Sequence, residues 1–128
     1  MSSRRESLPQ LLLIESEAPI RRRLQLLLQG KGYQVLSFAS ASTALADPVS
    51  TQAPYVVVDY ALPYCDGIEA LHRLKGMGWQ GVAVLITAFF SETLRAQAIS
   101  AGFVEVLSKP FSDDALMEEL GGVIEQAL

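Results

Sequence analysis

The sequence predicts a doubly wound α/β sandwich, in which helices cover both faces of a parallel sheet. Five short apolar runs alternate with five longer segments of helical periodicity, and the connections between them are short. Three of the runs are continuously apolar, which is typical of strands that are buried on both faces. Of the 128 residues, 50% are hydrophobic and 19% are charged, which is the composition of a single globular domain.

The apolar runs predict strands at 11–14, 35–38, 55–58, 82–86 and 104–107, and the segments between and after them predict helices at 18–29, 41–47, 67–76, 92–101 and 112–127. Pro19 suits the first turn of the first helix, and Ser91 and Ser112 are expected to cap the fourth and fifth helices. Gly30 and Gly32 are expected to end the first helix. The inner faces of the first and last helices are expected to carry Ile20, Leu24, Leu27 and Leu28, and Leu116, Leu120, Val123, Ile124 and Leu128.

Composition and charge exclude several functions. The formal net charge of −4 argues against a direct nucleic-acid partner, because binding to phosphates requires a basic face. The short basic runs at 4–5 and 21–23 are expected to be solvated surface. With Cys65 as the only cysteine, no internal disulfide can form, and no apolar stretch approaches the roughly 20 residues of a membrane span. We therefore expect a cytoplasmic protein that does not contact membranes.

The domain organisation is expected to be simple. Residues 1–9 are polar up to Pro9 and are expected to form a flexible N-terminal arm, followed by one domain over residues 10–128. Because the fifth helix reaches the end of the sequence, we expect no effector domain within these 128 residues.

Polar residues follow four of the five predicted strands. Glu15, Ser16 and Glu17 come after the first strand, Asp59 after the third, Thr87 and Ala88 after the fourth, and Lys109 and Pro110 after the fifth. Ligands of open parallel sheets bind outside the carboxyl ends of the strands. We therefore expect carboxylates, a hydroxyl and an ammonium group to converge on one rim of the sheet.

These residues carry a resemblance to a known family. The chain resembles the receiver domains of response regulators (CheY-like) over roughly residues 10–127, and the resemblance implies a flavodoxin-like (βα)5 fold with strand order 2-1-3-4-5. The matching motifs are Asp59, Pro63 and Gly67 in DYALPYCDG, Thr87-Ala88 in LITAFF, and Lys109-Pro110-Phe111 in LSKPF.

The resemblance implies a phosphorylation switch. Asp59 would be the nucleophile that accepts a phosphoryl group from a phosphohistidine. Mg²⁺ would bind Glu15, Asp59 and the backbone carbonyl of Ala61, with water completing its octahedron. Such a domain is not a conventional enzyme, but it catalyses its own phosphorylation at Asp59 and its own dephosphorylation.

The same resemblance implies roles for three further residues. Lys109 would pair with the phosphoryl oxygens, and a cis peptide bond between Lys109 and Pro110 would aim the ammonium into the site. Thr87 would donate a hydrogen bond to the phosphoryl group once it is attached. Ala88 is small and leaves the approach open.

The sequence departs from the family pattern at two positions. Ser16 stands where the family has a second acidic metal ligand, so Mg²⁺ is expected to bind weakly, with Ser16 as a weak or water-mediated contact. Glu17 follows, but its place at the start of a helix is a sufficient explanation for an acid there. Val106 stands at the family's aromatic switch position, and a stiff apolar valine cannot swing as a tyrosine does. Phe89 and Phe90 are candidates to replace it, or are hydrophobic anchors.

The implied partners are a histidine kinase or a phosphotransfer protein, docking near the first helix and the rim. The face formed by the fourth helix, fifth strand and fifth helix is the family's usual site for an output domain or a homodimer contact. A pseudo-receiver, acting as a phosphorylation-independent docking or dimerisation module, is the main alternative, favoured by Ser16 and Val106 and opposed by the intact Asp59, Thr87 and Lys109.

Other features of the sequence are weaker evidence for a function. A flavodoxin-type FMN carrier would need a hydroxyl-rich phosphate loop after the first strand, where two glutamates would repel a phosphate. The pattern GMGWQG at 76–81 follows a helix and precedes a strand, the reverse of a dinucleotide-binding loop, so we expect a turn. His72 is expected to be a helix-surface residue, and Cys65 an exposed thiol.

Overall fold

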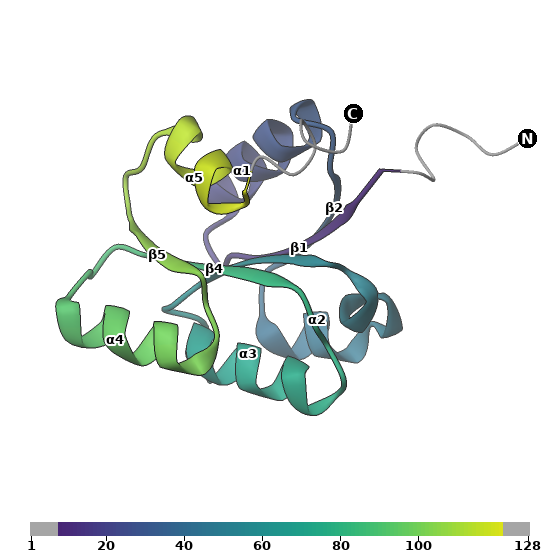
Figure 1. Cartoon of the computed structure of the whole chain (residues 1–128). Helices are drawn as coiled ribbons and strands as arrows, with labels where there is room; N and C mark the ends of the chain where they lie inside the picture. The colour runs from purple at the N-terminus through teal and green to yellow at the C-terminus, as the bar shows by residue number, and fades with distance from the viewer. Residues whose placement is uncertain (1–7, 122–128) are drawn as a thin grey trace, which may run out of the picture.

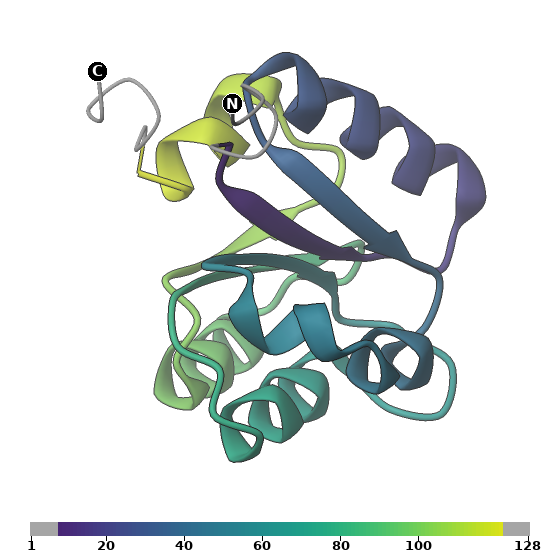
Figure 2. The ribbon, with the colours of Figure 1, turned by 90° about the vertical axis from the view of Figure 1, so that its right-hand side faces the viewer.

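The computed structural model describes residues 8–121 and contains a five-stranded parallel sheet with helices on both faces. The strand order is β2-β1-β3-β4-β5, so the predicted fold class and topology are confirmed. Helices α1 and α5 cover one face of the sheet, while α2, α3 and α4 cover the other (Figures 1 and 2). The elements are β1 (Gln10–Ile14), α1 (Ala18–Gly30), β2 (Gln34–Phe38), α2 (Ala41–Ala46), the 3-10 helix η2 (Pro48–Gln52), β3 (Tyr55–Asp59), α3 (Gly67–Gly76), β4 (Val82–Thr87), α4 (Glu92–Ala101), β5 (Glu105–Ser108) and α5 (Asp113–Glu119).

Two apolar cores hold the layers together, one on each face of the sheet. Alternate residues of β1, β3 and β4 point into opposite cores, which explains why these strands are apolar throughout. Leu12 and Val56 belong to the core under α2, α3 and α4, whereas Leu11 and Val57 belong to the core under α1 and α5. The indole of Trp79 is buried in the first of these cores, and its Nε1 donates a hydrogen bond to the carbonyl of Ala53 at 2.6 Å.

Local signals in the sequence set the helix boundaries. The side chains of Ser91 and Ser112 accept hydrogen bonds from backbone N–H groups in the first turns of α4 and α5, so both predicted N-caps are confirmed. Pro19 lies in the first turn of α1, which ends at Gly30 as expected. Helix α4 ends at Ala101 and is capped by Gly102, whose φ of +113° lies in the left-handed region that glycine adopts without strain.

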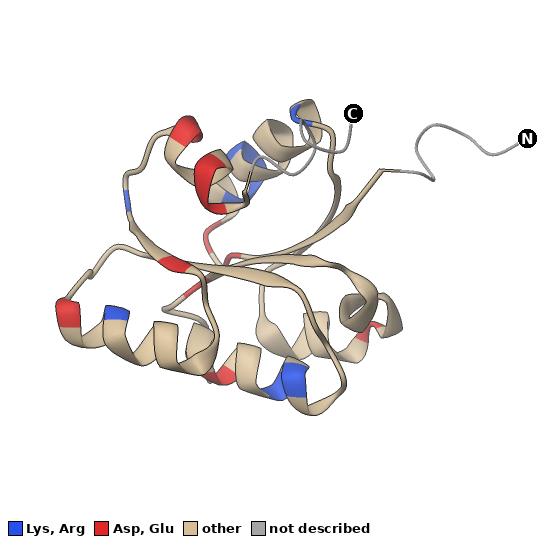
Figure 3. Cartoon of the chain, viewed as in Figure 1, with Lys and Arg blue, Asp and Glu red and all other residues tan. Residues whose placement is uncertain are grey.

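Charge differs between the two helices that share a face. Figure 3 shows basic residues on α1 and acidic residues on α5. One ion pair joins these helices, with Arg23 Nη2 lying 3.4 Å from Asp113 Oδ1. Both side chains are largely exposed, so this pair contributes at most about 1 kcal/mol to stability.

Several predicted boundaries differ from the structure. Helix α2 ends at Ala46, because Asp47 caps the 3-10 helix η2 through a hydrogen bond from Val49 N to its Oδ1 at 3.0 Å; η2 was not predicted. Strand β5 begins at Glu105 and ends at Ser108, one residue later than expected. The last helix was predicted over 112–127, but α5 ends at Glu119, because Leu120 and Gly121 form a turn and Gly121 has a φ of +84°. Val123, Ile124 and Leu128 of the predicted helix lie outside the described residues, as do residues 1–7 of the predicted arm. Pro9 accepts a hydrogen bond from Gln34 N at 2.9 Å.

Candidate functional site

The predicted convergence of polar groups occurs at the carboxyl ends of β1, β3 and β5. Lys109, which follows β5, extends its ammonium between two carboxylates from the other strands. Its Nζ lies 2.6 Å from Glu15 Oε1 and 3.2 Å from Asp59 Oδ2. These three residues are separated by tens of positions in the sequence, and the parallel topology alone brings them together.

Asp59 is the last residue of β3 and is only 4% exposed. Its Oδ1 accepts a hydrogen bond from Ala61 N at 3.3 Å, which leaves Oδ2 facing Lys109. The backbone behind Asp59 is packed closely against the start of α3. A Cβ added to Gly67 would lie 2.6 Å from the carbonyl oxygen of Asp59, so only glycine allows this approach.

Lys109 is held by both its backbone and its side chain. Its N–H donates to the carbonyl of Thr87 at 2.7 Å, and the Lys109-Pro110 peptide bond is cis, as the family resemblance implied. Burial lowers the pKa of the ammonium, but the hydrogen bond from Lys109 to Glu15 and the negative charges of Glu15 and Asp59 outweigh it, and the net pKa is raised. Lys109 therefore stays charged at neutral pH.

Glu15 is fully buried, although it is a carboxylate. Burial raises its pKa, opposed by the hydrogen bond from Lys109 and by the backbone N–H of Glu17, which donates to Glu15 Oε2 at 3.0 Å. The loop itself is held from α1, because Arg21 Nη1 donates to the carbonyl of Glu15 at 2.9 Å and to that of Ser16 at 3.3 Å. Arg21 was expected to be solvated surface; that prediction is wrong for this residue, because its guanidinium folds back onto the loop.

Thr87 and Val106 are the two residues at the positions where the family resemblance predicted a switch. Thr87 is the last residue of β4 and is fully buried, and its Oγ1 accepts a hydrogen bond from Phe89 N at 3.0 Å. Val106 is 5% exposed and pairs with Leu85 of β4. Phe90 lines a hollow of about 460 Å³ together with Val106, between α4, β5 and α5, whereas Phe89 lies 77% exposed at the rim.

A pocket of about 360 Å³ opens above these groups, lined by Ser16, Glu17, Asp59, Ala61, Ala88, Phe89 and Lys109. A second pocket of about 360 Å³ adjoins it, sharing Glu17, Ala88 and Lys109, and continues between α1 and Phe111. The first pocket therefore gives access to the Asp59 carboxylate, and Ala88 lies at its wall as expected.

The oxygen atoms at this pocket are of the type that coordinates a magnesium ion. Asp59 contributes carboxylate oxygens, and Ser16 and Ala61 line the same pocket with further oxygens, which are the ligands that Mg²⁺ prefers. The buried carboxylate of Glu15 lies beneath this pocket, 2.6 Å from Lys109 Nζ. As they stand, however, no three Asp, Glu, His or Cys side chains within residues 8–121 are close enough together to hold a metal. The oxygen ligands at the pocket are thus of the kind that Mg²⁺ binds, but they include fewer carboxylates than the family pattern provides.

Glu17 lies at the start of α1, as predicted. It is the N-cap residue of α1, yet its side chain makes no capping hydrogen bond. Its Oε2 lies 4.0 Å from Lys109 Nζ instead.

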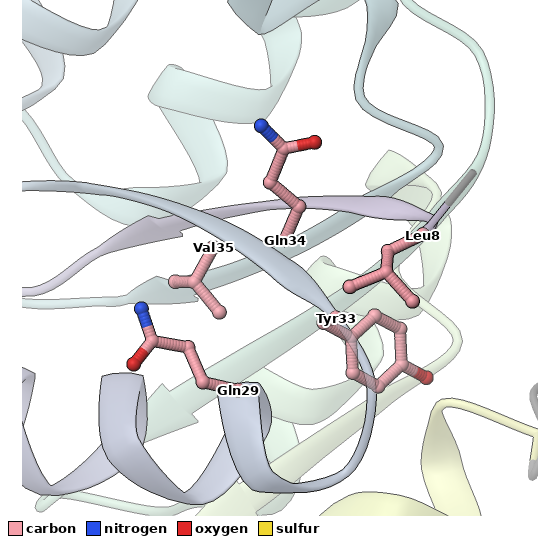
Figure 4. A pocket seen from close by; sticks show the side chains of 5 residues that line it. All are labelled: Leu8, Gln29, Tyr33, Gln34 and Val35. Carbon is pink, nitrogen blue, oxygen red and sulfur yellow. The ribbon is translucent and has the colours of Figure 1, made fainter. Parts of the chain in front are cut away.

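Other signals lie away from the rim. His72 is exposed on α3, and residues 77–81, with a turn at 77–78 and a bend at 81, connect α3 to β4, so both predictions are confirmed. Cys65 is half-buried against the core under α2, α3 and α4, and burial raises the pKa of its thiol, so the predicted exposed thiol is wrong. Figure 4 shows a pocket of about 480 Å³ at the opposite ends of the strands, lined by Leu8, Gln29, Tyr33, Gln34 and Val35.

The sheet order and the rim of aspartate, threonine and lysine are those of a receiver domain. The family model of the response regulator receiver domain matches residues 11–121, and the chain belongs to this family of two-component systems.

Two curated relatives and one solved structure illustrate the family. The chain is 32% identical to the transcriptional regulatory protein FixJ of Bradyrhizobium diazoefficiens, over 90% of this chain and 56% of FixJ. It is 32% identical to the KDP operon transcriptional regulatory protein KdpE of Escherichia coli, over 85% of this chain and 48% of KdpE. The chain therefore spans about half the length of these relatives. A response regulator receiver protein from Pseudoalteromonas atlantica has the same fold, with a TM-score of 0.83, 23% identity, and 94% of this chain and 100% of that chain covered.

Within residues 8–121, every helix is too short or too polar to span a membrane.

Proposed function

We propose that this receiver domain is a signalling switch that accepts a phosphoryl group on Asp59. The observation that carries the proposal is the position of Lys109, whose ammonium lies 3.2 Å from Asp59 Oδ2 at the bottom of an open pocket. An ammonium in this place reduces the repulsion between a carboxylate nucleophile and an incoming anionic phosphoryl group.

In the proposed reaction an oxygen of Asp59 attacks the phosphorus atom of a phosphohistidine. The new O–P bond forms as the N–P bond breaks, and the imidazole of the donor leaves with the electron pair of that bond. Lys109 neutralises the phosphoryl oxygens, and Thr87 moves its hydroxyl from Phe89 N to the attached group. Mg²⁺, held by Glu15, Asp59 and the carbonyl of Ala61, would supply additional neutralisation of the charge on the transferred group when bound.

The phosphodonor is proposed to be a histidine kinase or a phosphotransfer protein. The second pocket supports docking beside the phosphorylation site, because it continues from Lys109 along α1 and joins the pocket over Asp59. The hollow between α4, β5 and α5 is proposed as the site where an output domain or a second copy of the chain binds. FixJ and KdpE are transcriptional regulators by name, and a link between this chain and transcription is likewise a proposal.

Intact mass after incubation with acetyl phosphate and magnesium tests the proposal. We expect the wild type to gain one phosphoryl group and Asp59→Asn to gain none. Asp66→Asn is the matched control, since Asp66 lies in the same loop and caps α3 through a hydrogen bond from Glu69 N at 2.8 Å. Equal labelling of the wild type and Asp59→Asn would contradict the assignment.

A pseudo-receiver that binds its partner without phosphorylation is the second candidate. Buried Val106 favours it, because no aromatic side chain stands at that position to change rotamer. Two measurements separate these functions. A pseudo-receiver gains no mass from acetyl phosphate, and its partner binding is unchanged by Asp59→Asn.

A further inference from the structure

We infer that Arg21 is a positioning residue of the phosphorylation site, which acts through the loop between β1 and α1. The inference rests on the proposed function, because Arg21 would position Glu15, the carboxylate that binds Lys109 beside the phosphorylated residue. Arg21 itself lies on α1. Its role is to keep the loop in the conformation that directs the Glu15 carboxylate at the ammonium of Lys109.

The first argument is which groups the Arg21 guanidinium binds. Glu17 precedes Arg21 by four residues, the spacing and order at which a glutamate and an arginine on a helix form a favourable ion pair. Within residues 8–121, however, Arg21 makes no ion pair. Its Nη1 donates instead to two neutral acceptors, the carbonyls of Glu15 at 2.9 Å and Ser16 at 3.3 Å. Both carbonyls precede the N-cap of α1, where they have no partner within the helix, so Arg21 supplies a donor to each.

The second argument is the series of contacts that links this loop to the ammonium. The backbone of Glu15 is bound on both sides, because its N–H donates to the carbonyl of Phe38 at 3.0 Å and its carbonyl accepts from Arg21. Its side chain is bound at both oxygens, Oε1 by Lys109 Nζ at 2.6 Å and Oε2 by the N–H of Glu17 at 3.0 Å. A shift of this backbone would therefore move a fully buried carboxylate relative to Lys109.

The basic run of α1 supplies a contrast. Arg22 and Arg23 follow Arg21 directly and are exposed, and Arg23 Nη2 lies 3.4 Å from Asp113 Oδ1 of α5. Arg21 is half-buried. In the part of the chain that the structure describes, Arg21 is the one arginine of the three that hydrogen-bonds to the loop between β1 and α1. Arg22 carries the same charge on the same helix, which makes it a matched control.

The rate at which acetyl phosphate and magnesium label Asp59, followed by intact mass, tests the role of Arg21 in the reaction. Arg21→Met should slow labelling by about tenfold, since a misplacement of about 1 Å at a reacting site can cost as much as about 100-fold. Arg21→Lys keeps a side-chain donor for the two carbonyls and should stay within about threefold of the wild type. Arg22→Met removes an exposed, screened charge and should change the rate by less than about twofold.

Hydrogen exchange of the Glu17 amide measures the loop independently of phosphorylation. This N–H is bound to Glu15 Oε2, so Arg21→Met should raise its exchange rate by about tenfold relative to that of Leu12, whereas Arg22→Met should not. Leu12 lies in β1 and is fully buried, so the ratio separates a local loosening of the loop from a general loss of stability. Should Arg21→Met fail to fold, Arg21→Gln takes its place in both measurements.

The two measurements distinguish the inference from the proposed function. A wild type that gains no mass contradicts the proposed function, and the role of Arg21 in the reaction fails with it, while the exchange rates still show whether Arg21 fixes the loop. Labelling of Arg21→Met at the wild-type rate overturns the inference alone. An unchanged ratio of the Glu17 and Leu12 exchange rates in Arg21→Met overturns it as well.

Discussion

Replacement of Lys109 by methionine probes the cluster of charges at the rim. The substitution keeps an apolar side chain of similar length and removes the ammonium. Glu15 is fully buried and has no other cation within ion-pair distance among the described residues, so it is left as an uncompensated buried charge. Breaking a buried ion pair by removing one partner costs about 3–5 kcal/mol.

For Lys109→Met we expect a loss of folding free energy at the lower end of that range. Lys109 is 12% exposed, and after the substitution Glu15 keeps its hydrogen bond from Glu17 N while Asp59 keeps the one from Ala61 N. We therefore expect Lys109→Met to lower the free energy of unfolding by about 3 kcal/mol. With a slope of about 2 kcal/mol per molar urea, the midpoint should fall by about 1.5 M.

Urea unfolding followed by Trp79 fluorescence measures this change, because the one tryptophan of the chain is buried in the core. A chelator should be present, so that a bound cation does not stabilise either protein. Lys31→Met is the control, since Lys31 is an exposed lysine that makes no ion pair with any residue between 8 and 121. The double variant Glu15→Gln/Lys109→Met should recover at least half of the loss. A midpoint for Lys109→Met within about 0.3 M of the wild type would refute the reasoning.

Two further predictions concern the support of the site and of the face around β5. Gly67→Ala should destabilise the protein by about 1–3 kcal/mol and slow phosphorylation, because its Cβ would lie 2.6 Å from the Asp59 carbonyl; Gly76→Ala, with open space around it, should do neither. The hydrogen bond from Arg95 to Glu105 lowers the pKa of Glu105, so the stabilisation it gives is present above the unfolded pKa of about 4.3 and is lost as pH falls through the lower folded value. Thermal unfolding at pH 7 and at pH 3 should show Glu105→Gln less stable than the wild type at the higher pH only, and an equal deficit at both would contradict this.

The sequence predicted the rim well because few alternatives existed. Once the apolar runs are assigned to parallel strands, the residues that follow them must lie at one edge of the sheet. The meeting of Glu15, Asp59 and Lys109 needed no further information. The buried Thr87 followed in the same way, from its place at the end of the fourth run.

The contacts that sequence reasoning missed depend on side-chain torsions and on loop packing. Glu17 had a sufficient local explanation at a helix start, and only the structure shows that its side chain makes no cap. Arg21 belongs to a basic run whose polar face is usually solvated, and nothing in the sequence indicates that it turns back to the carbonyls of residues 15 and 16. Cys65 was misjudged because the burial of a loop residue depends on the elements beneath it.

The two departures from the family pattern have different physical consequences. Charge acts over several ångströms, so the missing carboxylate at Ser16 changes the electrostatics of the whole rim. A rotamer switch requires an aromatic ring at the switch position, and Val106 is a buried valine with a stiff, short side chain. If Asp59 is phosphorylated, the response must therefore travel through groups that can move. The bond between Thr87 Oγ1 and Phe89 N is the nearest of these, since a Thr87 that turns to the phosphoryl group releases the exposed Phe89. We thus expect phosphorylation to alter the surface of the loop between β4 and α4 before that of β5.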